Sequence, residues 1–144
     1  MFNIITPTYN RRHTLIRVYE SLLRQSFKDF IWIIIDDCST DNTDKLIENW
    51  IAKRKFNIIY KKLSVNKGKS HAVNFGLDLC SKPYTIIADS DDSFDYNTLF
   101  DLNKEWVLLS KKQRNPAIAS IWTLTKTTDG QLIGQRFPNN YWIV

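Results

Sequence analysis

Three carboxylates stand close together directly after an apolar run of the sequence. Asp89, Asp91 and Asp92 follow the segment "YTIIA" at residues 84–88. Hard divalent cations such as Mg²⁺ and Mn²⁺ prefer oxygen ligands and can bridge one or two carboxylates to substrate phosphates, which would relieve the repulsion among these charges. The same residue types also form turns and cap helices, here a helix expected to begin near Asn97. By itself, the cluster leaves both interpretations open.

Two further acidic residues, Asp36 and Asp37, follow another apolar run. A carboxylate beyond a strand end can accept hydrogen bonds from a nucleobase N–H group or a ribose hydroxyl, or it can cap the following helix. Tyr9, after a third such run, could stack on a base or pack against its neighbours. Lys69, near an expected helix start, could meet a phosphate or point into water. Each residue is therefore a candidate for a ligand site, with a structural role as the alternative.

The apolar runs that precede these side chains have the pattern of strands alternating with helices. The expected strands are residues 2–6, 30–35, 56–63, 84–88 and 117–125, and a hairpin is expected in 127–137 with its turn at Asp129 and Gly130. Helical spacing of apolar residues predicts helices around residues 15–23, 46–51, 72–80 and 99–109. Candidate caps for the second helix are Ser39, Thr40, Asp41 and Asn42. This alternation predicts an α/β sandwich with a mainly parallel sheet, whose ligands would bind beyond the carboxyl ends of the strands.

The bulk composition fits one soluble globular domain with ample material for a core. The 144 residues are 43% hydrophobic and carry a net charge of +5. No apolar stretch reaches the ~18 residues of a membrane span, so a cytoplasmic location is expected. Clusters of lysine and arginine suit an anionic partner such as a nucleotide diphosphate or an acidic membrane face, although most such clusters are solvated surface. Cys38 and Cys80 are expected to be reduced structural thiols.

Several other functional classes are disfavoured by the sequence. The chain has four glycines and contains neither G-x-G-x-x-G nor G-x-x-x-x-G-K-[ST], which argues against the usual dinucleotide fold and against a P-loop. His13 and His71 have no partners at the spacing of a triad or a metal site. A nucleotidyltransferase usually has a glycine-rich loop near its first strand, where this chain reads "ITPTYNRRHT". A receiver domain would need its acid pair at that same place.

Taken in order, the polar motifs resemble the nucleotide-sugar-binding half of family 2 glycosyltransferases, which have the GT-A fold. The series is "PTYN" after the first strand, "DDCSTDNT" after the second, "NKG" before the third helix and "DSDD" after the fourth strand. The resemblance covers nearly the whole chain and implies a Rossmann-like α/β/α sandwich. It implies a single nucleotide-sugar-binding domain over residues 1–144, truncated at its C-terminal side. The implied reaction is transfer of a sugar from a nucleotide diphosphate sugar to an acceptor hydroxyl, with inversion, in polysaccharide or glycoconjugate synthesis.

The resemblance also implies roles for individual residues. Tyr9 would lie along the base, and Asp37, with Asp36 beside it, would contact base or ribose. Asp91 would bind Mg²⁺ or Mn²⁺ directly, with Asp89 nearer the ribose and Asp92 in support. The complete nucleotide-binding set expected is Thr6, Pro7, Tyr9, Asp36, Asp37, Lys69, Asp89 and Ser90. The expected donor is a UDP-sugar, and the acceptor a saccharide or a lipid-linked group, which would bring the protein to the inner face of the membrane. Nucleic acid is not an expected partner.

Two departures from the family pattern limit what the resemblance implies. Many relatives read A-R-N where this chain has Ala72-Val73-Asn74, so a cationic contact to the donor is missing, and whether Lys69 replaces it stays open. The family's catalytic base sits in a later acidic motif, but no comparable motif is formed by the later acidic residues, which are Asp95, Asp101, Glu105 and Asp129. The alternative function is therefore a non-catalytic nucleotide-sugar-binding module, or an inactive fragment that lacks the acceptor site and the base.

Overall fold

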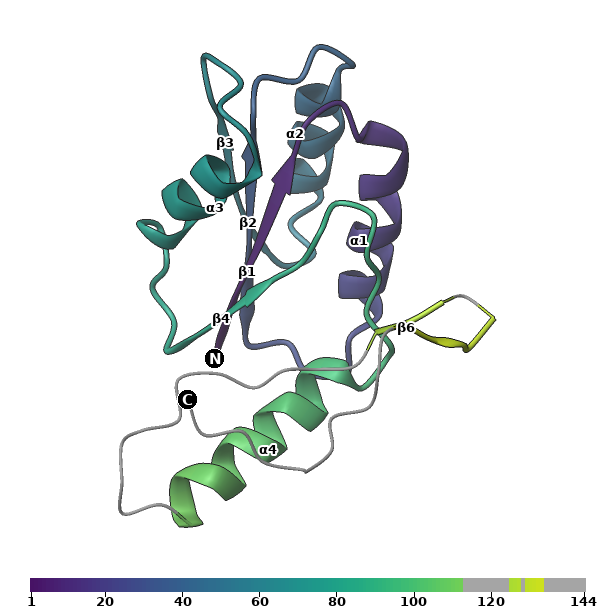
Figure 1. The fold of residues 1–144 in the computed structure, drawn as a ribbon, viewed down its shortest axis with the longest axis vertical. Helices are drawn as coiled ribbons and strands as arrows, with labels where there is room; N and C mark the ends of the chain where they lie inside the picture. Colours follow the sequence, from purple (N-terminus) through teal and green to yellow (C-terminus); the bar gives the residue numbers. More distant parts are fainter. Residues whose placement is uncertain (113–124, 128, 134–144) are drawn as a thin grey trace. The chain divides into compact units, whose positions relative to one another are not determined.

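The computed structural model describes residues 1–112, 125–127 and 129–133. The chain divides into two compact units, Met1–Trp106 and Val107–Val144. Along the chain the elements are β1 (Phe2–Thr8), α1 (Arg12–Arg24), β2 (Phe30–Asp36), α2 (Thr43–Lys53), β3 (Asn57–Lys62), α3 (Lys69–Leu77), β4 (Tyr84–Ile87), α4 (Thr98–Lys112), β5 (Thr125–Lys126) and β6 (Leu132–Ile133) (Figure 1). The single domain expected over residues 1–144 stays a prediction.

The first unit is built on a four-stranded sheet in the order β3-β2-β1-β4. All three pairings are parallel, and Phe2 lies opposite both Phe30 and Tyr84. The carboxyl ends of the strands therefore meet at one edge of the sheet, as expected for this class of fold. The predicted α/β sandwich with a parallel central sheet is confirmed.

Apolar side chains cover both faces of the sheet because alternate residues of a strand point to opposite sides. On β2, Phe30, Trp32 and Ile34 join a core cluster with side chains of α1 and α2, and its aromatic centre includes Tyr19 stacked on Trp50 with ring centroids 4.3 Å apart. The intervening residues Ile31, Ile33 and Ile35 pack on the other face with Ala72 of α3. Strand β2 is thus buried along its whole length.

Helix α3 approaches the sheet closely at a glycine. A Cβ atom on Gly76 would lie 2.7 Å from Cγ2 of Ile5, a distance that requires a shift in the neighbouring chain. The apolar spacing that predicted a helix around residues 72–80 includes Leu77 on the buried face, and this is wrong because Leu77 is 46% exposed. Because successive helical residues are about 100° apart, the residue after the closest contact turns away from the sheet. Leu23 of α1 and Ile51 of α2 are exposed for the same reason.

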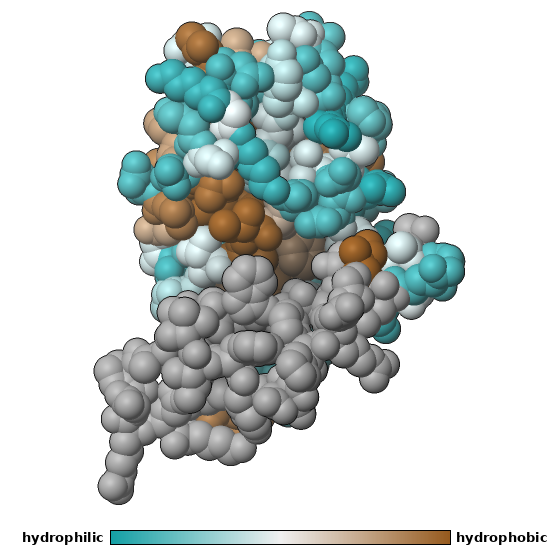
Figure 2. Space-filling model, in the orientation of Figure 1, coloured by the Kyte–Doolittle hydropathy of each residue, from teal (hydrophilic) through white to brown (hydrophobic). Residues whose placement is uncertain are grey.

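Two regions of the first unit differ in surface character. Figure 2 shows hydrophilic residues over the end towards which the strands run, and hydrophobic side chains gathered in the region of α3 and β4. The exposed large apolar residues of these two elements are Phe75, Leu77 and Ile87. Among the described helices, none is both long and apolar enough to cross a membrane.

Two local predictions are refined by the structure. Asn42, one of the expected caps of α2, adopts a left-handed conformation and makes no side-chain cap hydrogen bond. Asp41 acts instead, since its Oδ1 accepts hydrogen bonds from the backbone N–H and the hydroxyl of Thr43. A hairpin with the predicted turn is present as β5 and β6, with Gly130 at φ 87°, but its first strand, Thr125–Lys126, precedes the predicted range 127–137. Of the expected strand 117–125, all but Thr125 lies outside the described residues.

Candidate functional site

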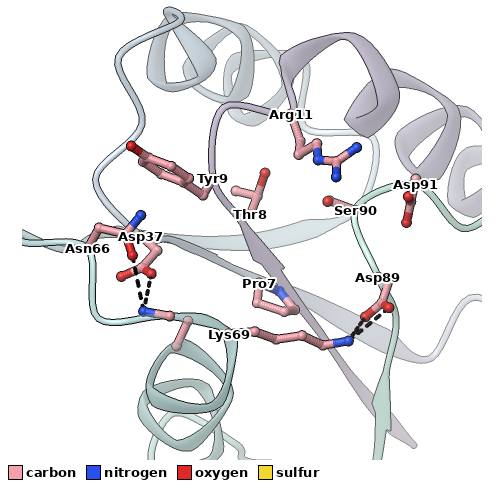
Figure 3. A pocket seen from close by; sticks show the side chains of 12 residues that line it. Pro7, Thr8, Tyr9, Arg11, Asp37, Asn66, Lys69, Asp89, Ser90 and Asp91 are labelled. Carbon is pink, nitrogen blue, oxygen red and sulfur yellow. Dashed lines mark hydrogen bonds and ion pairs between the residues drawn. The ribbon is translucent and has the colours of Figure 1, made fainter.

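A cleft of about 380 Å³ opens at the carboxyl ends of the strands in the first unit (Figure 3). Its lining comes from the end of β1 and the turn after it, from residues after β2 and β4, from the loop before α3 and from α3. The lining residues are Pro7, Thr8, Tyr9, Arg11, Asp37, Asn66, Gly68, Lys69, Ala72, Asp89, Ser90 and Asp91. Seven of the residues that the sequence singled out therefore share this cleft, namely Pro7, Tyr9, Asp37, Lys69, Asp89, Ser90 and Asp91.

The segments after β1 and β2 hold each other in place at one side of the cleft. The backbone N–H of Asn10 donates to Oγ of Ser39 at 2.9 Å, and the N–H of Thr40 donates to Oδ1 of Asn10 at 2.8 Å. Asn10 has a φ of 52°, a conformation that asparagine tolerates better than most residues. This sharp turn leaves the side chain of Tyr9 46% exposed at the cleft.

Asp37 shapes the cleft through the loop that precedes α3. Its carboxylate is almost completely buried and accepts hydrogen bonds from the backbone N–H groups of Lys67 at 2.9 Å and Gly68 at 2.6 Å. Gly68 has a φ of 88°, which favours glycine at this position. The side-chain oxygen of Asn66 accepts a further bond from the N–H of Gly68, at 3.1 Å. Asp37 thus fixes the course of the chain into α3.

Two predicted nucleotide-binding residues, Thr6 and Asp36, have internal partners and do not line the cleft. Both are fully buried. Oγ1 of Thr6 accepts a hydrogen bond from Nε1 of Trp32 at 2.9 Å. The carboxylate of Asp36 accepts from the N–H of Ser39 at 2.7 Å and from the hydroxyl of Tyr60 at 2.8 Å. Burial, together with this bond, raises the pKa of Tyr60 above its ordinary value of 10.0.

The loop after β4 carries the three clustered carboxylates, and each has different surroundings. Asp89 is paired with Nζ of Lys69 at 2.6 Å. Oδ2 of Asp92 accepts the backbone N–H of Asp89 at 2.9 Å, so Asp92 closes the turn and is absent from the cleft lining. The carboxylate of Asp91 is exposed and has no hydrogen-bond or ion-pair partner within the described part of the chain. Its backbone oxygen accepts from Nη2 of Arg17 at 2.7 Å.

These carboxylates suit a metal that arrives with phosphate oxygens better than a metal held by protein alone. Within residues 1–112, 125–127 and 129–133, no three His, Cys, Asp or Glu side chains are grouped so as to hold a metal ion. A Mg²⁺-type cation, however, is usually bound by one or two carboxylates together with substrate phosphates and water. Asp91 and Asp89 are two carboxylates that line one cleft.

Five lining residues had no role assigned from sequence: Thr8, Arg11, Asn66, Gly68 and Ala72. Oγ1 of Thr8 is buried without a hydrogen-bond partner among the described residues, which marks it as a group that a ligand could satisfy. Arg11 directly follows "PTYN", so its position next to that turn could have identified it as a candidate lining residue. Asn66 and Gly68 belong to the "NKG" motif.

Other residues considered from sequence lie outside this lining. They include both histidines and Val73, where many relatives are expected to have arginine. Cys38 and Cys80 are free thiols, as predicted, and their Sγ atoms donate to backbone oxygens of Ser64 and Gly76.

Comparison with known proteins places the chain in a family. The model of "Glycosyl transferase family 2" matches residues 3–107. The chain is 32% identical over 103 residues to the poly(ribitol-phosphate) beta-N-acetylglucosaminyltransferase TarS of Staphylococcus aureus, covering 69% of this chain and 18% of TarS. It is 30% identical to the dolichyl-phosphate beta-glucosyltransferase of Dictyostelium discoideum, covering 93% of this chain and 43% of that enzyme. It therefore spans less than half the length of either relative.

Solved structures agree with the sequence comparison. The crystal structure of TarS 1-349 of S. aureus in complex with UDP-GlcNAc matches with a TM-score of 0.68 and 31% identity, over 72% of this chain and 30% of that one. The mannosyltransferase PcManGT of Pyrobaculum calidifontis, in complex with GDP-Man and Mn²⁺, matches with a TM-score of 0.69 over 81% of this chain and 33% of that one, and at 19% identity it supports the fold alone. With the family model matching most of its length, this chain belongs to glycosyl transferase family 2.

Proposed function

We propose that this chain forms the donor-binding part of a glycosyltransferase that binds a nucleotide diphosphate sugar together with Mg²⁺ or Mn²⁺. The observation that carries the proposal is the cleft, which brings Tyr9, Asp37, Lys69, Asp89 and Asp91 together at one edge of the parallel sheet. Similarity to a TarS structure that contains UDP-GlcNAc supports a UDP-sugar as the donor. The sugar would pass to a hydroxyl of a saccharide or lipid-linked acceptor, with inversion. A cytoplasmic location, at the membrane for a lipid-linked acceptor, belongs to the same proposal.

The base and ribose would occupy the side of the cleft built by the segments after β1 and β2. There the exposed ring of Tyr9 offers a face for stacking, which contributes about 1–3 kcal/mol per base in proteins that bind nucleic acid strands. The buried Asp37 holds the amides of the loop before α3 and keeps the shape of this side. The hydroxyl of Thr8, which has no hydrogen-bond partner in the described part of the chain, would provide a further hydrogen bond to the donor.

The diphosphate would lie towards the loop after β4. Asp91, which has no internal partner within the described residues, would be the main protein ligand of the metal, and Asp89 the second. When bound, the divalent cation would stabilise the negative charge that develops on the departing diphosphate. The positive side chains of Arg11 and Lys69 line the same cleft and would add to that stabilisation. The role of catalytic base is left unassigned, because Asp95, Asp101 and Glu105 are absent from the lining.

Titration calorimetry with UDP tests the proposal. We expect UDP to bind in the presence of Mn²⁺ and to lose this binding when the metal is chelated. Asp91→Asn should weaken metal-dependent UDP binding by about tenfold or more, the loss expected for a charged ligand contact worth ~1.5–3 kcal/mol. Its free energy of unfolding should stay within ~0.5 kcal/mol of the parent because the side chain is exposed.

A matched control is Asp95→Asn, which removes one carboxylate from the same loop but outside the cleft lining. It should bind UDP and Mn²⁺ like the parent. The proposal is wrong if neither UDP, GDP nor dTDP binds in a metal-dependent manner, or if Asp91→Asn binds as tightly as the parent.

A further inference from the structure

Lys69 and Asp89 form an ion pair inside the proposed donor cleft. Nζ of Lys69 lies 2.6 Å from Oδ1 and 2.8 Å from Oδ2 of Asp89, so the ammonium group contacts both oxygens of the carboxylate. Figure 3 shows the lysine side chain reaching across from α3 to the loop after β4. The other ion pairs of the described residues, between Met1 and Asp29, Lys62 and Asp44, and Lys82 and Asp29, involve no lining residue.

This pair places a cation of the protein on one of the two carboxylates that the metal would use. A divalent cation binds through the same oxygen lone pairs that the ammonium group engages, so the two cations compete for Asp89. Asp91, in contrast, presents its carboxylate without a partner within the described residues. The pair is also open to exchange, since the side chains of Lys69 and Asp89 are 59% and 46% exposed and such pairs contribute little stability.

The position of Lys69 gives it a second anion to bind. It is the first residue of α3, directly after the loop whose amides are held by Asp37. A diphosphate in the cleft would lie within the space that Lys69 already lines, and the flexible four-carbon stem of lysine allows its ammonium group to move between two anions. The phosphate oxygens are strong acceptors for such a donor.

We infer that Lys69 competes with the divalent cation for Asp89 and transfers to the diphosphate when the donor binds, so that metal and nucleotide bind cooperatively. This inference rests on the proposed donor site and specifies which charged groups pair with one another before and after the donor binds. Without nucleotide, Lys69 weakens metal binding at Asp89. With nucleotide, the lysine leaves Asp89 for the diphosphate, and both oxygens become available to the metal. By linkage, the metal then tightens nucleotide binding by the same factor by which the nucleotide tightens metal binding.

The test measures Mn²⁺ binding with and without UDP in the parent chain and in Lys69→Met, which keeps the apolar stem without the charge. Without UDP, the variant should bind Mn²⁺ about two- to fivefold more tightly, the range set by the strength of an exposed ion pair. With saturating Mn²⁺, it should bind UDP about tenfold more weakly, because a charge-assisted hydrogen bond to the diphosphate is lost. The factor by which UDP tightens Mn²⁺ binding should therefore be smaller in the variant. Damage to the fold would weaken the binding of both Mn²⁺ and UDP. Tighter Mn²⁺ binding together with weaker UDP binding therefore identifies the competition.

Lys67→Met is the matched control for the loss of one positive charge near the cleft. Lys67 is exposed, does not line the cleft and has no side-chain partner within the described residues. If Lys69→Met binds Mn²⁺ no more tightly than Lys67→Met does, the competition is refuted, even where UDP binding falls. If the parent chain shows no Mn²⁺-dependent binding of UDP, GDP or dTDP, the proposed function fails and the inference fails with it.

Discussion

The acidic residues at the end of β2 and those after β4 are both clustered aspartates, but their surroundings are opposite. Asp36 and Asp37 are buried, and their carboxylates are occupied by N–H and hydroxyl donors of the protein. Asp91 is exposed and Asp89 is half-buried, and of the two only Asp89 has a side-chain partner among the described residues, the ammonium group of Lys69. A buried carboxylate must be hydrogen-bonded within the protein, whereas an exposed one is solvated and can bind an external cation. The first pair therefore builds the loops around the cleft, and the second leaves ligand oxygens in it.

The largest expected effect separates the two pairs by stability. Asp36→Ala should lower the free energy of unfolding by about 3 kcal/mol or more, because the N–H of Ser39 and the hydroxyl of Tyr60 lose their acceptor in the interior. Asp91→Ala, at an exposed position, should change it by less than ~0.5 kcal/mol. Denaturant unfolding of both variants checks this.

If Asp36→Ala fails to fold, Tyr60→Phe tests the same hydrogen-bond network with a smaller perturbation. Removing this hydroxyl leaves Oδ2 of Asp36 without its donor, and a loss of about 1–2 kcal/mol is expected. Equal stability losses in Asp36→Ala and Asp91→Ala would remove the distinction between the two acidic pairs.

A smaller effect concerns Asp41, which joins two helices on the β2 side. Its carboxylate accepts from Thr43 at the start of α2 and from the N–H of Arg12 at the start of α1. Burial alone would raise the pKa of Asp41, but these hydrogen bonds outweigh it and lower the pKa below 3.8. The ionised form is thus favoured by folding, so its stabilisation is present above pH 3.8 and is lost as the pH falls through the lowered value.

Asp41→Asn should therefore cost about 1 kcal/mol at neutral pH, as for the loss of a helix cap. The difference from the parent should shrink in unfolding measurements made well below pH 3.8. Glu48→Gln, at an exposed position of α2, is the control and should show neither effect. A difference that is constant over this pH range would show that the charge of Asp41 is not involved.

The smallest expected effect concerns the hydrogen bond that holds the loop after β4 to α1. Arg17 of α1 is exposed and donates to the backbone oxygen of Asp91, which positions that residue without burying it. Arg17→Met should weaken Mn²⁺-dependent UDP binding about two- to fivefold, in line with an exposed charged contact, and leave the unfolding free energy nearly unchanged. Arg24→Met, at an exposed position of the same helix whose side chain makes no hydrogen bond to Asp91 within the described residues, should leave binding as it is. A large loss of stability without a change in affinity would instead give Arg17 a structural role.

Much of the fold was predictable because it depends on local patterns. The doubly apolar run of β2 is typical of a strand covered on both faces, and the order of strands and helices indicated a parallel sheet. The inferred family was likewise confirmed, because its evidence is an ordered series of short motifs. Burial of single helix residues such as Leu77 was less predictable, since a rotation of one residue decides it.

The sequence by itself determined which chemistry could occur at the strand ends, because residue type and strand order decide what polar groups meet at one edge of a parallel sheet. Only the tertiary structure decided how the acids divide their roles. Asp36 and Asp37 are adjacent in sequence, yet Asp36 turns to Ser39 and Tyr60 while Asp37 binds the loop before α3. Likewise, the contact between Lys69 and Asp89 joins residues that are 20 positions apart. Such partners depend on burial and on donors from distant segments, which composition and spacing do not reveal.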